Sequence, residues 1–378
     1  MKLLYILNIA NKVNSFSYTS MKAAQKLGIE YHIAGNWNYT NEEERKCDEA
    51  RLGIRIYQID FIRTPYHPGN INAYKQLEKI VKQEHFDAIH CNTPIGGVVG
   101  RLLGKKYNIK TVIYQAHGFH FFDHAPVVNW LIYYPIERFL ARYTDVLITI
   151  NEEDYKRAHT FKLRKNGKVY FVPGVGIDTT EYLSDAESRK KKREELGISD
   201  KEIMLISAGD LVKRKNYDVS IHAISKANNS RLQFFICGVG PENQKLNALV
   251  KSLDLQKQIH FLGYRNDIKE LLDAADIFLF TTLQEGLPRS LSEAMAMGLP
   301  SISSKIRGNV DLIENRKQGI LCSPSNAEEF ATAINELADS ELLRGKMSKE
   351  SKLKIKQFDI DASQKALIDV YTKELLEK

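Results

Sequence analysis

Short runs of aliphatic residues recur along the chain and alternate with longer amphipathic stretches. Their length and their content of Val, Ile and Leu predict β-strands, and the stretches between them predict helices. Most of these strands are apolar throughout rather than at every second position, which indicates a parallel sheet covered on both faces. In the first half of the chain the runs lie at residues 3–9, 29–34, 54–59, 88–91, 111–114, 146–150 and 169–173.

The same alternation begins again in the second half. A charged helix is predicted at about residues 186–196, and further strands are predicted at residues 203–207, 233–237, 259–262, 277–281 and 301–303. A chain of 378 residues is longer than one hydrophobic core usually supports. We therefore expect an α/β protein with two Rossmann-like, doubly wound parallel-sheet domains that face each other across a cleft. The domains are expected at residues 1–180 and 181–355, with a C-terminal helix at 356–378 that packs back on the first domain.

The composition adds little to this picture but excludes several classes of protein. A hydrophobic content of 43% and a charged content of 27% are typical of a globular protein. No stretch approaches the roughly 20 apolar residues that span a bilayer. The cysteines lie too far apart for a metal or redox motif, and we expect reduced thiols in the cytoplasm. They are Cys47, Cys91, Cys237 and Cys322.

The net charge of +7 is unevenly distributed. The whole excess of basic residues lies in residues 1–180, whereas basic and acidic residues are equal in number in the rest. Such a basic half could attract nucleic acid, anionic lipid or a phosphorylated substrate. A solvated basic surface is the simpler interpretation.

The segment richest in candidate chemistry is residues 282–300. It contains Glu285 and Glu293 on either side of a Gly- and Pro-containing loop that leads into a predicted helix. Backbone amides of such a loop and the positive end of a helix can bind a diphosphate. The carboxylates can accept hydrogen bonds from the hydroxyls of a ribose or a sugar ring. Arg289 and Glu293 are expected on one helix face, since they are four residues apart.

A second cluster begins at Gly209, directly after a predicted strand. Three consecutive cations, at residues 213–215, follow before the next helix. Their charges could neutralise a leaving diphosphate. A solvated charged loop is the alternative.

These segments resemble the family 4 glycosyltransferases, which are retaining enzymes of GT-B fold, from about residue 111 to 325. Glu285 and Glu293 match the family's two glutamates separated by seven residues, and Lys215 matches its phosphate-binding lysine. The resemblance implies that Glu285 lies beside the donor sugar and that Glu293 binds the nucleotide ribose. Gly286, Leu287 and Pro288 match backbone contacts to the donor sugar and phosphate.

The first half resembles the subgroup of this family that builds capsular and exopolysaccharides. Residues 116–121, 143–151 and 172–178 carry this resemblance. It implies that His117 approaches the donor sugar, while His120 stays undecided. It also implies a lipid-linked or oligosaccharide acceptor, and hence peripheral contact with the cytoplasmic face of the membrane.

The sequence departs from the family at two places. Many members carry Arg where this chain has Asp210, so that Arg214 or Arg289 would have to supply the second phosphate-binding cation. Many members also carry a Gly-Gly loop after the first strand, which residues 8–16 lack.

The expected site follows from the resemblance. We expect front-face transfer of a sugar from a UDP-sugar, with no metal ion, no separate cofactor and no nucleic-acid partner. The expected catalytic residues are His117, Lys215 and Glu285. The expected donor-binding residues are Gly209, Arg214, Tyr264, Arg265, Gly286, Leu287, Pro288, Arg289 and Glu293.

The stretch at residues 119–143 interleaves aromatic side chains with Arg138 and Arg142. It suits an interfacial surface that holds a lipid-linked acceptor, and it also suits an ordinary core helix. Pro135 is expected to begin a second helix there.

Two other functions compete with the transferase. A nicotinamide-dependent dehydrogenase would share the doubly wound halves and Gly238-Val239-Gly240, but the chain lacks the full glycine fingerprint after the first strand. A module that binds nucleic acid or a lipid surface would use the basic half and leave Glu285 and Glu293 unexplained. Salt-sensitive binding of nucleic acid without binding of a sugar nucleotide would favour such a module.

Overall fold

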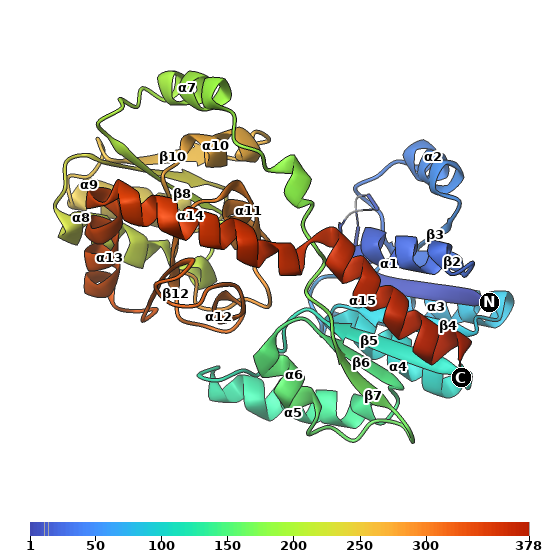
Figure 1. Cartoon of the computed structure of the whole chain (residues 1–378). Helices are drawn as coiled ribbons and strands as arrows, with labels where there is room; N and C mark the ends of the chain where they lie inside the picture. The colour runs from blue at the N-terminus through green and yellow to red at the C-terminus, as the bar shows by residue number, and fades with distance from the viewer. Residues whose placement is uncertain (11, 14, 378) are drawn as a thin grey trace. The chain divides into compact units, whose positions relative to one another are not determined.

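The computed structural model describes residues 1–10, 12–13 and 15–377. The chain divides into two compact units, each built on one parallel sheet (Figure 1). The first unit comprises Met1–Gly176 together with the segment from Ile360 onward, and the second comprises Ile177–Asp359. The expectation of two doubly wound α/β domains is therefore confirmed.

The first unit has a seven-stranded sheet in the order β3-β2-β1-β4-β5-β6-β7, and its paired strands are parallel. Its strands are β1 (Lys2–Ile9), β2 (Glu30–Asn36), β3 (Arg55–Gln58), β4 (Ala88–Asn92), β5 (Thr111–Ala116), β6 (Val146–Thr149) and β7 (Lys168–Phe171). Its α-helices are α1 (Ser15–Lys26), α2 (Glu42–Leu52), α3 (Asn70–Glu84), α4 (Pro94–Lys106), α5 (Val127–Ala141), α6 (Glu152–Ala158) and α15 (Ile360–Tyr371).

Both faces of this sheet are buried, because neighbouring residues of its central strand point to opposite sides. Leu4 belongs to the core cluster that contains Leu77 of α3. Leu3 belongs to the cluster on the other side, with Met21 of α1 and Leu367 of α15. This explains why the strand is apolar at every position rather than at every second one.

The second unit has a six-stranded sheet in the order β10-β9-β8-β11-β12-β13, again with parallel pairing. Its strands are β8 (Ile203–Ala208), β9 (Leu232–Cys237), β10 (Ile259–Gly263), β11 (Ile277–Phe280), β12 (Ser301–Ser304) and β13 (Gly319–Cys322). Its α-helices are α7 (Ala186–Glu195), α8 (Tyr217–Ala227), α9 (Asn243–Ser252), α10 (Ile268–Ala274), α11 (Arg289–Met297), α12 (Asn309–Leu312), α13 (Ala327–Asp339) and α14 (Glu341–Ile355).

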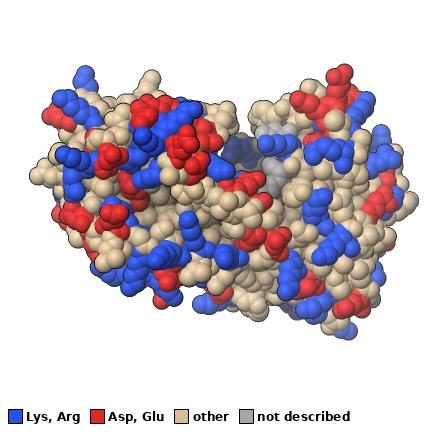
Figure 2. Space-filling model, turned by 45° about the horizontal axis from the view of Figure 1, so that its top comes forward, with Lys and Arg blue, Asp and Glu red and all other residues tan. Residues whose placement is uncertain are grey.

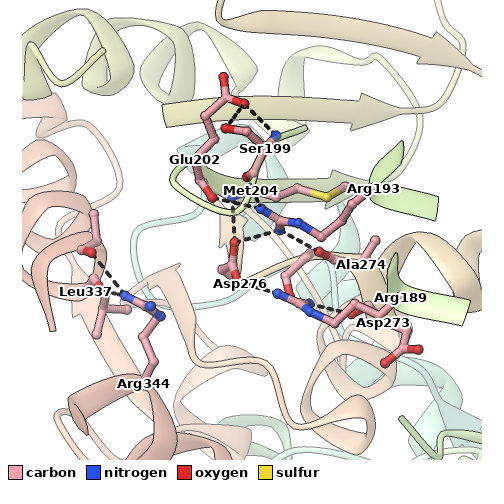
Figure 3. A network of polar contacts seen from close by, with 12 residues as sticks. Arg189, Arg193, Ser199, Glu202, Met204, Asp273, Ala274, Asp276, Leu337 and Arg344 are labelled. Atoms are coloured by element: carbon pink, nitrogen blue, oxygen red, sulfur yellow. Dashed lines mark hydrogen bonds and ion pairs between the residues drawn. The ribbon is translucent and has the colours of Figure 1, made fainter. Parts of the chain in front are cut away.

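Two arginines of the charged helix α7 form ion pairs with the second sheet (Figure 3). Arg189 and Arg193 each reach one carboxylate oxygen of Asp276, at 2.6 and 3.1 Å. Asp276 precedes β11 and also accepts a hydrogen bond from the backbone N–H of Met204 in β8. Charge-assisted hydrogen bonds of this kind are stronger than neutral ones. They connect α7 to the two neighbouring strands at the start of the sheet.

The C-terminal helix α15 joins the first unit through a buried polar chain. Its Tyr371 hydroxyl lies 2.6 Å from Oγ of Ser20 in α1 and 2.7 Å from Nδ1 of His90 in β4. Burial lowers the pKa of His90 to about 3, so its imidazole is neutral near pH 7. The neutral ring can therefore share a hydrogen bond with the tyrosine without a buried charge.

One expectation from the sequence is wrong, and one strand was not expected. Pro135 lies inside α5 rather than at the start of a second helix. The short strand β13 was not expected, although it pairs with β12 over four positions. In the part of the chain that the structure describes, no helix has the length and apolar character needed to cross a bilayer.

Candidate functional site

The predicted donor loops gather at one edge of the second sheet. The strand order reverses at β8, because β9 and β10 extend the sheet on one side and β11 to β13 extend it on the other. Gly209 follows β8, and the loop with Glu285 follows the adjacent strand β11. In open α/β sheets ligands bind beyond the carboxyl ends of the strands at this kind of reversal.

Lys215 is one of the cations that lie at this edge of the sheet. It ends a short 3-10 turn, Lys213–Lys215, after which Asn216 takes a left-handed backbone conformation with φ 57°. Although it is a lysine, its side chain is buried, and its Nζ lies 4.7 Å from the centre of the Phe280 ring. Buried lysines need a partner for their charge, and this partner is Glu285.

Glu285 lies between several donors that all reach the same carboxylate oxygen. Its Oε1 is 2.8 Å from Nζ of Lys215 and 3.1 Å from Nη1 of Arg214. The hydroxyl of Thr282 donates to the same oxygen at 2.9 Å. Lys215 and Arg214 come from the loop after β8, whereas Glu285 and Thr282 come from the loop after β11. The pairing therefore depends on these two strands being neighbours.

Arg214 is the better placed of the two candidates for the second phosphate-binding cation. Its side chain is about half exposed and lies in the same cluster as Lys215. Arg289 instead donates its Nε to Oε1 of Glu293 at 2.8 Å, as the spacing of four residues predicts. Asp210 itself is exposed.

The loops at this edge are packed backbone to backbone. A Cβ on Gly238, after β9, would lie 2.0 Å from the carbonyl oxygen of Gly209. A Cβ on Gly308, whose φ is 82°, would lie 2.5 Å from the carbonyl oxygen of Gly286. Only glycine fits at these two positions. The close approach holds the loops after β8 and β11 in place.

Helix α11 follows the second loop, as the sequence predicts. Pro288 is its N-cap residue, and Gly298 caps its C-terminus with a left-handed φ of 93°. Glu293 lies on the first turns of this helix and is mostly buried. The neighbouring Tyr182 hydroxyl has its pKa raised, first by burial and then by the charge of Glu293. Glu293 therefore has both Arg289 and Tyr182 as partners.

Arg307 is a residue of this site that the sequence analysis missed. It follows β12, is buried, and donates its Nε to the backbone oxygen of Glu285 at 3.0 Å. The signal was present in the sequence, since a cation followed by Gly308 comes shortly after a predicted strand. The same reasoning that selected Lys215 would have selected it.

Tyr264 and Arg265 lie farther along the edge, after β10. Tyr264 is largely exposed. Arg265 is held by Asp267, with Nε 2.7 Å from Oδ1, and its guanidinium keeps the pKa of that carboxyl well below its usual range. Strand β9 separates β10 from β8, so these residues form a separate group from the Lys215 cluster.

His117 belongs to the first unit, where it follows β5. Its Nε2 lies 2.9 Å from Oδ1 of Asn92 at the end of β4, an arrangement in which the imidazole donates. Burial lowers its pKa to about 4, so the ring is neutral near pH 7. The backbone N–H of Phe119 donates to Asp154 of α6 and fixes the loop. Of residues 8–16, Asn11 and Asn14 lie outside the described part of the chain.

Both halves of the chain match known families. Residues 5–151 match the family described as Glycosyl transferase 4-like, and residues 188–354 match Glycosyl transferases group 1. The chain is 30% identical to EpsD of Bacillus subtilis (strain 168), which carries the name of a glycosyltransferase, over 98% of this chain and 96% of that protein. It is 28% identical to the Escherichia coli UDP-Gal:alpha-D-GlcNAc-diphosphoundecaprenol alpha-1,3-galactosyltransferase, over 79% of this chain and 80% of that enzyme.

Solved structures agree on the fold. HepE of Anabaena in complex with UDP-glucose has a TM-score of 0.79 at 17% identity, and the match covers 99% of this chain and 100% of that one. WaaG, a glycosyltransferase involved in lipopolysaccharide biosynthesis, has a TM-score of 0.74 at 18% identity, with 98% and 99% covered. Both halves match glycosyltransferase families, a relative is similar over its full length, and the two sheets are parallel and doubly wound. This chain is therefore a glycosyltransferase and belongs to family 4, of GT-B fold.

Proposed function

We propose that this protein is a retaining glycosyltransferase that moves a sugar from a UDP-sugar to a lipid-linked acceptor in the synthesis of a bacterial capsular or exopolysaccharide. The E. coli relative is named for a UDP-sugar donor and a diphosphoundecaprenol-linked acceptor, which supports both parts of the proposal. The observation that carries it is the cluster of Lys215, Arg214 and Glu285 at the reversal point of the second sheet.

The cations of this cluster are proposed to hold the leaving diphosphate. Lys215 and Arg214 share the Oε1 of Glu285. A bound diphosphate would offer them further oxygens, and their charge would stabilise the negative charge that develops as the glycosidic bond to the phosphate breaks. Because the cations and loop amides are already present, we propose that the reaction needs neither a metal ion nor a separate cofactor.

The two glutamates are proposed to bind hydroxyl groups at different places on the donor. Glu285 lies in the loop after β11, and the next two residues, Gly286 and Leu287, would present backbone N–H groups to the sugar and the phosphate. Glu293 lies about one turn along α11 and would accept hydrogen bonds from the ribose. Both are mostly buried carboxylates, which strengthens the hydrogen bonds that they accept.

His117 is proposed to contact the donor sugar from the first unit. Its neutral imidazole can donate or accept a hydrogen bond without adding a charge next to the reacting ring. The acceptor hydroxyl is proposed to attack on the face from which the diphosphate leaves. The hydroxyl's proton then passes to the departing phosphate oxygen, and the anomeric configuration is retained.

The deciding experiment is to incubate the purified protein with a panel of UDP-sugars and a polyprenyl-diphosphate-linked sugar acceptor, and to measure released UDP. Nuclear magnetic resonance of the product then gives the anomeric configuration of the new bond. We expect acceptor-dependent release of UDP with one sugar and retention of configuration. Inversion would contradict the retaining assignment. Turnover with a sugar donor that carries another nucleotide, but with none of the UDP-sugars, would contradict the donor assignment.

A further inference from the structure

The first unit has a pocket at the carboxyl ends of β1, β2 and β3. Its volume of about 600 Å³ lies within the usual range for small-molecule sites. Ile9 is the last residue of β1, Asn36 is the last residue of β2, and Phe61 follows β3. Because the strands are parallel, this is also the edge at which His117 follows β5. The pocket and His117 therefore lie along the same edge of one sheet.

The pocket is displaced from His117 along this edge. In the order β3-β2-β1-β4-β5, strand β4 lies between β1 and β5. Neighbouring strands are about 4.8 Å apart, so the axes of β1 and β2 lie about 10 and 14 Å from that of β5. A single sugar ring next to His117 is too small to fill a pocket at that distance. An acceptor that reaches both places therefore needs a further group beyond the reacting sugar.

The lining of the pocket has the chemistry of a sugar site. The ring of Tyr39 is 77% exposed and can pack against the C–H face of a pyranose. Asn38 is also exposed, and its Oδ1 accepts from Nε2 of Gln58 at 3.1 Å. The side-chain N–H groups of Asn38 are therefore the part that can donate to a ligand hydroxyl. An aromatic ring beside an amide suits a carbohydrate better than a wholly apolar ligand.

Arg63 supplies a positive charge to the same pocket. It is exposed and forms no ion pair with any residue in the described part of the chain. The described lining contains no acidic residue, and Asp60 bonds instead with Gln58 and Gln76. On the face shown in Figure 2, by contrast, basic and acidic side chains are mixed. A cation without an acidic neighbour in the lining favours a ligand that carries a negative charge.

Hydrogen bonds within the unit hold the walls of the pocket. Nδ2 of Asn36 donates to the backbone oxygen of Phe61 at 2.7 Å, which joins the end of β2 to the loop after β3. Oδ1 of Asn70, at the start of α3, accepts from the backbone N–H of Ile62 at 2.9 Å. Loops fixed in this way lose little freedom when a ligand binds. The pocket is therefore preorganised.

We propose that this pocket binds a second, acidic sugar of the acceptor glycan. The inference rests on the proposed function, because it names the class of acceptor on which that function would act. The reacting sugar would lie near His117. The sugar that follows it would pack against Tyr39 and place its carboxylate at Arg63. The acceptor would then be a lipid-linked oligosaccharide whose second sugar is a uronic acid or carries another carboxylate.

Charge and polarity favour such a sugar over the diphosphate of a lipid-linked acceptor. Proteins bind a diphosphate with several cations or with the N-terminus of a helix. The described lining offers one cation, Arg63. Ile9 and Tyr39 add apolar surface that a diphosphate cannot use. A sugar that carries one carboxylate can use the cation, the amide and the apolar surface together.

The test is a ligand-observed nuclear magnetic resonance titration of the full-length protein with methyl glucuronide and with methyl glucoside. We expect the glucuronide to bind about fivefold more tightly, because an exposed ion pair contributes on this scale. Arg63→Gln should abolish the difference between the two probes. Tyr39→Ala should weaken the binding of both about fivefold, since the apolar contact with the ring is lost.

Matched controls come from the same unit. Tyr66→Ala removes an exposed ring from the loop after β3 that does not line the pocket. Arg142→Gln removes an exposed cation between α5 and β6, at the opposite edge of the sheet. Both variants should bind the probes as the parent does. Equal binding of the two probes by the parent, or equal losses in the control and pocket variants, would overturn the proposal. So would pyrophosphate that binds more tightly than the glucuronide and loses this affinity in Arg63→Gln, because the pocket would then hold a diphosphate.

Binding of the probes and transfer of a sugar can fail separately. The probes contain neither a nucleotide nor a lipid, so the titration gives its result even if the proposed transfer does not occur. Where transfer occurs, Arg63→Gln should raise the KM for an acceptor whose second sugar is acidic and leave the KM for the donor unchanged. An unchanged KM for that acceptor would overturn the assignment of the pocket to the acceptor glycan.

Discussion

The Nζ of Lys215 lies 2.8 Å from Oε1 of Glu285, although the two residues are 70 positions apart in the sequence. Lys215 lies in the loop after β8 and Glu285 in the loop after β11, and these two strands are neighbours in the sheet. The pair places a cation and a carboxylate, which have opposite preferences for ligand atoms, side by side. A donor that carries both a diphosphate and sugar hydroxyls could use both of them.

We expect Lys215→Ala to lower kcat by about 10² to 10³, because loss of one preorganised donor at a developing charge has an effect of this size. The matched control is Lys213→Ala, which removes an exposed cation from the same turn. The control should keep parental kcat. Steady-state kinetics and melting curves of both variants make the comparison, and equal kcat for both would refute the role of Lys215.

The sequence predicts those features of the site that arise within one helix, strand or loop, but not the contacts between them. The strand ends, the helix that begins after Pro288 and the pairing of Arg289 with Glu293 follow from spacing within one element. The contact between Lys215 and Glu285 does not, since it arises from the order of strands in the sheet. The hydrogen bond from Arg307 to the backbone of Glu285 is non-local in the same way, because the two residues follow different strands, β12 and β11.

The two errors in the fold have physical causes. A proline inside a helix removes the hydrogen bond to the carbonyl four residues earlier. Pro135 and Leu131 both lie on the exposed face of α5, where water can satisfy that carbonyl. Strand β13 spans Gly319–Cys322 and begins with a glycine, a residue that is depleted in strands. It forms because β12 offers it an edge to pair with.

The acid sensitivity of the fold should depend in part on His117. Burial lowers its pKa from 6.5 to about 4, so below pH 6.5 the unfolded chain binds a proton that the folded chain does not. Its contribution to stability is therefore complete above pH 6.5 and decreases as the pH falls toward 4. Urea unfolding at pH 7 and pH 5 should show a smaller loss of stability for His117→Gln than for the parent.

The control for this experiment is His222→Gln, which replaces an exposed histidine on α8. It should lose as much stability between pH 7 and pH 5 as the parent does. If His117→Gln also loses as much stability between pH 7 and pH 5 as the parent does, His117 is not held neutral by the fold.

Transfer should persist in excess EDTA, because the proposed diphosphate site relies on Lys215, Arg214 and loop amides. Released UDP, measured before and after dialysis against the chelator, gives the comparison. A complete loss of turnover that manganese or magnesium restores would contradict this prediction and would require a metal ion in the donor complex.

Substitution of the two glutamates of the site should change different kinetic constants. Glu293→Ala removes a hydrogen bond to the ribose, which is made equally in the ground state and the transition state. Its main effect should be a raised donor KM. Glu285→Ala removes a contact to the sugar that strengthens as charge develops on the ring, so kcat should fall.

Melting curves separate these roles from purely structural ones, because both carboxylates also have partners within the protein. Glu285 pairs with Lys215 and Arg214, and Glu293 pairs with Arg289 and lies beside Tyr182. Tyr182→Phe is the matched control, since it removes a hydroxyl next to Glu293 and leaves the carboxylate in place. It should melt slightly lower than the parent and keep the parental KM. If both glutamate variants also melt lower but keep parental kcat and KM while folded, the carboxylates only brace the loop and α11, and the donor site lies elsewhere.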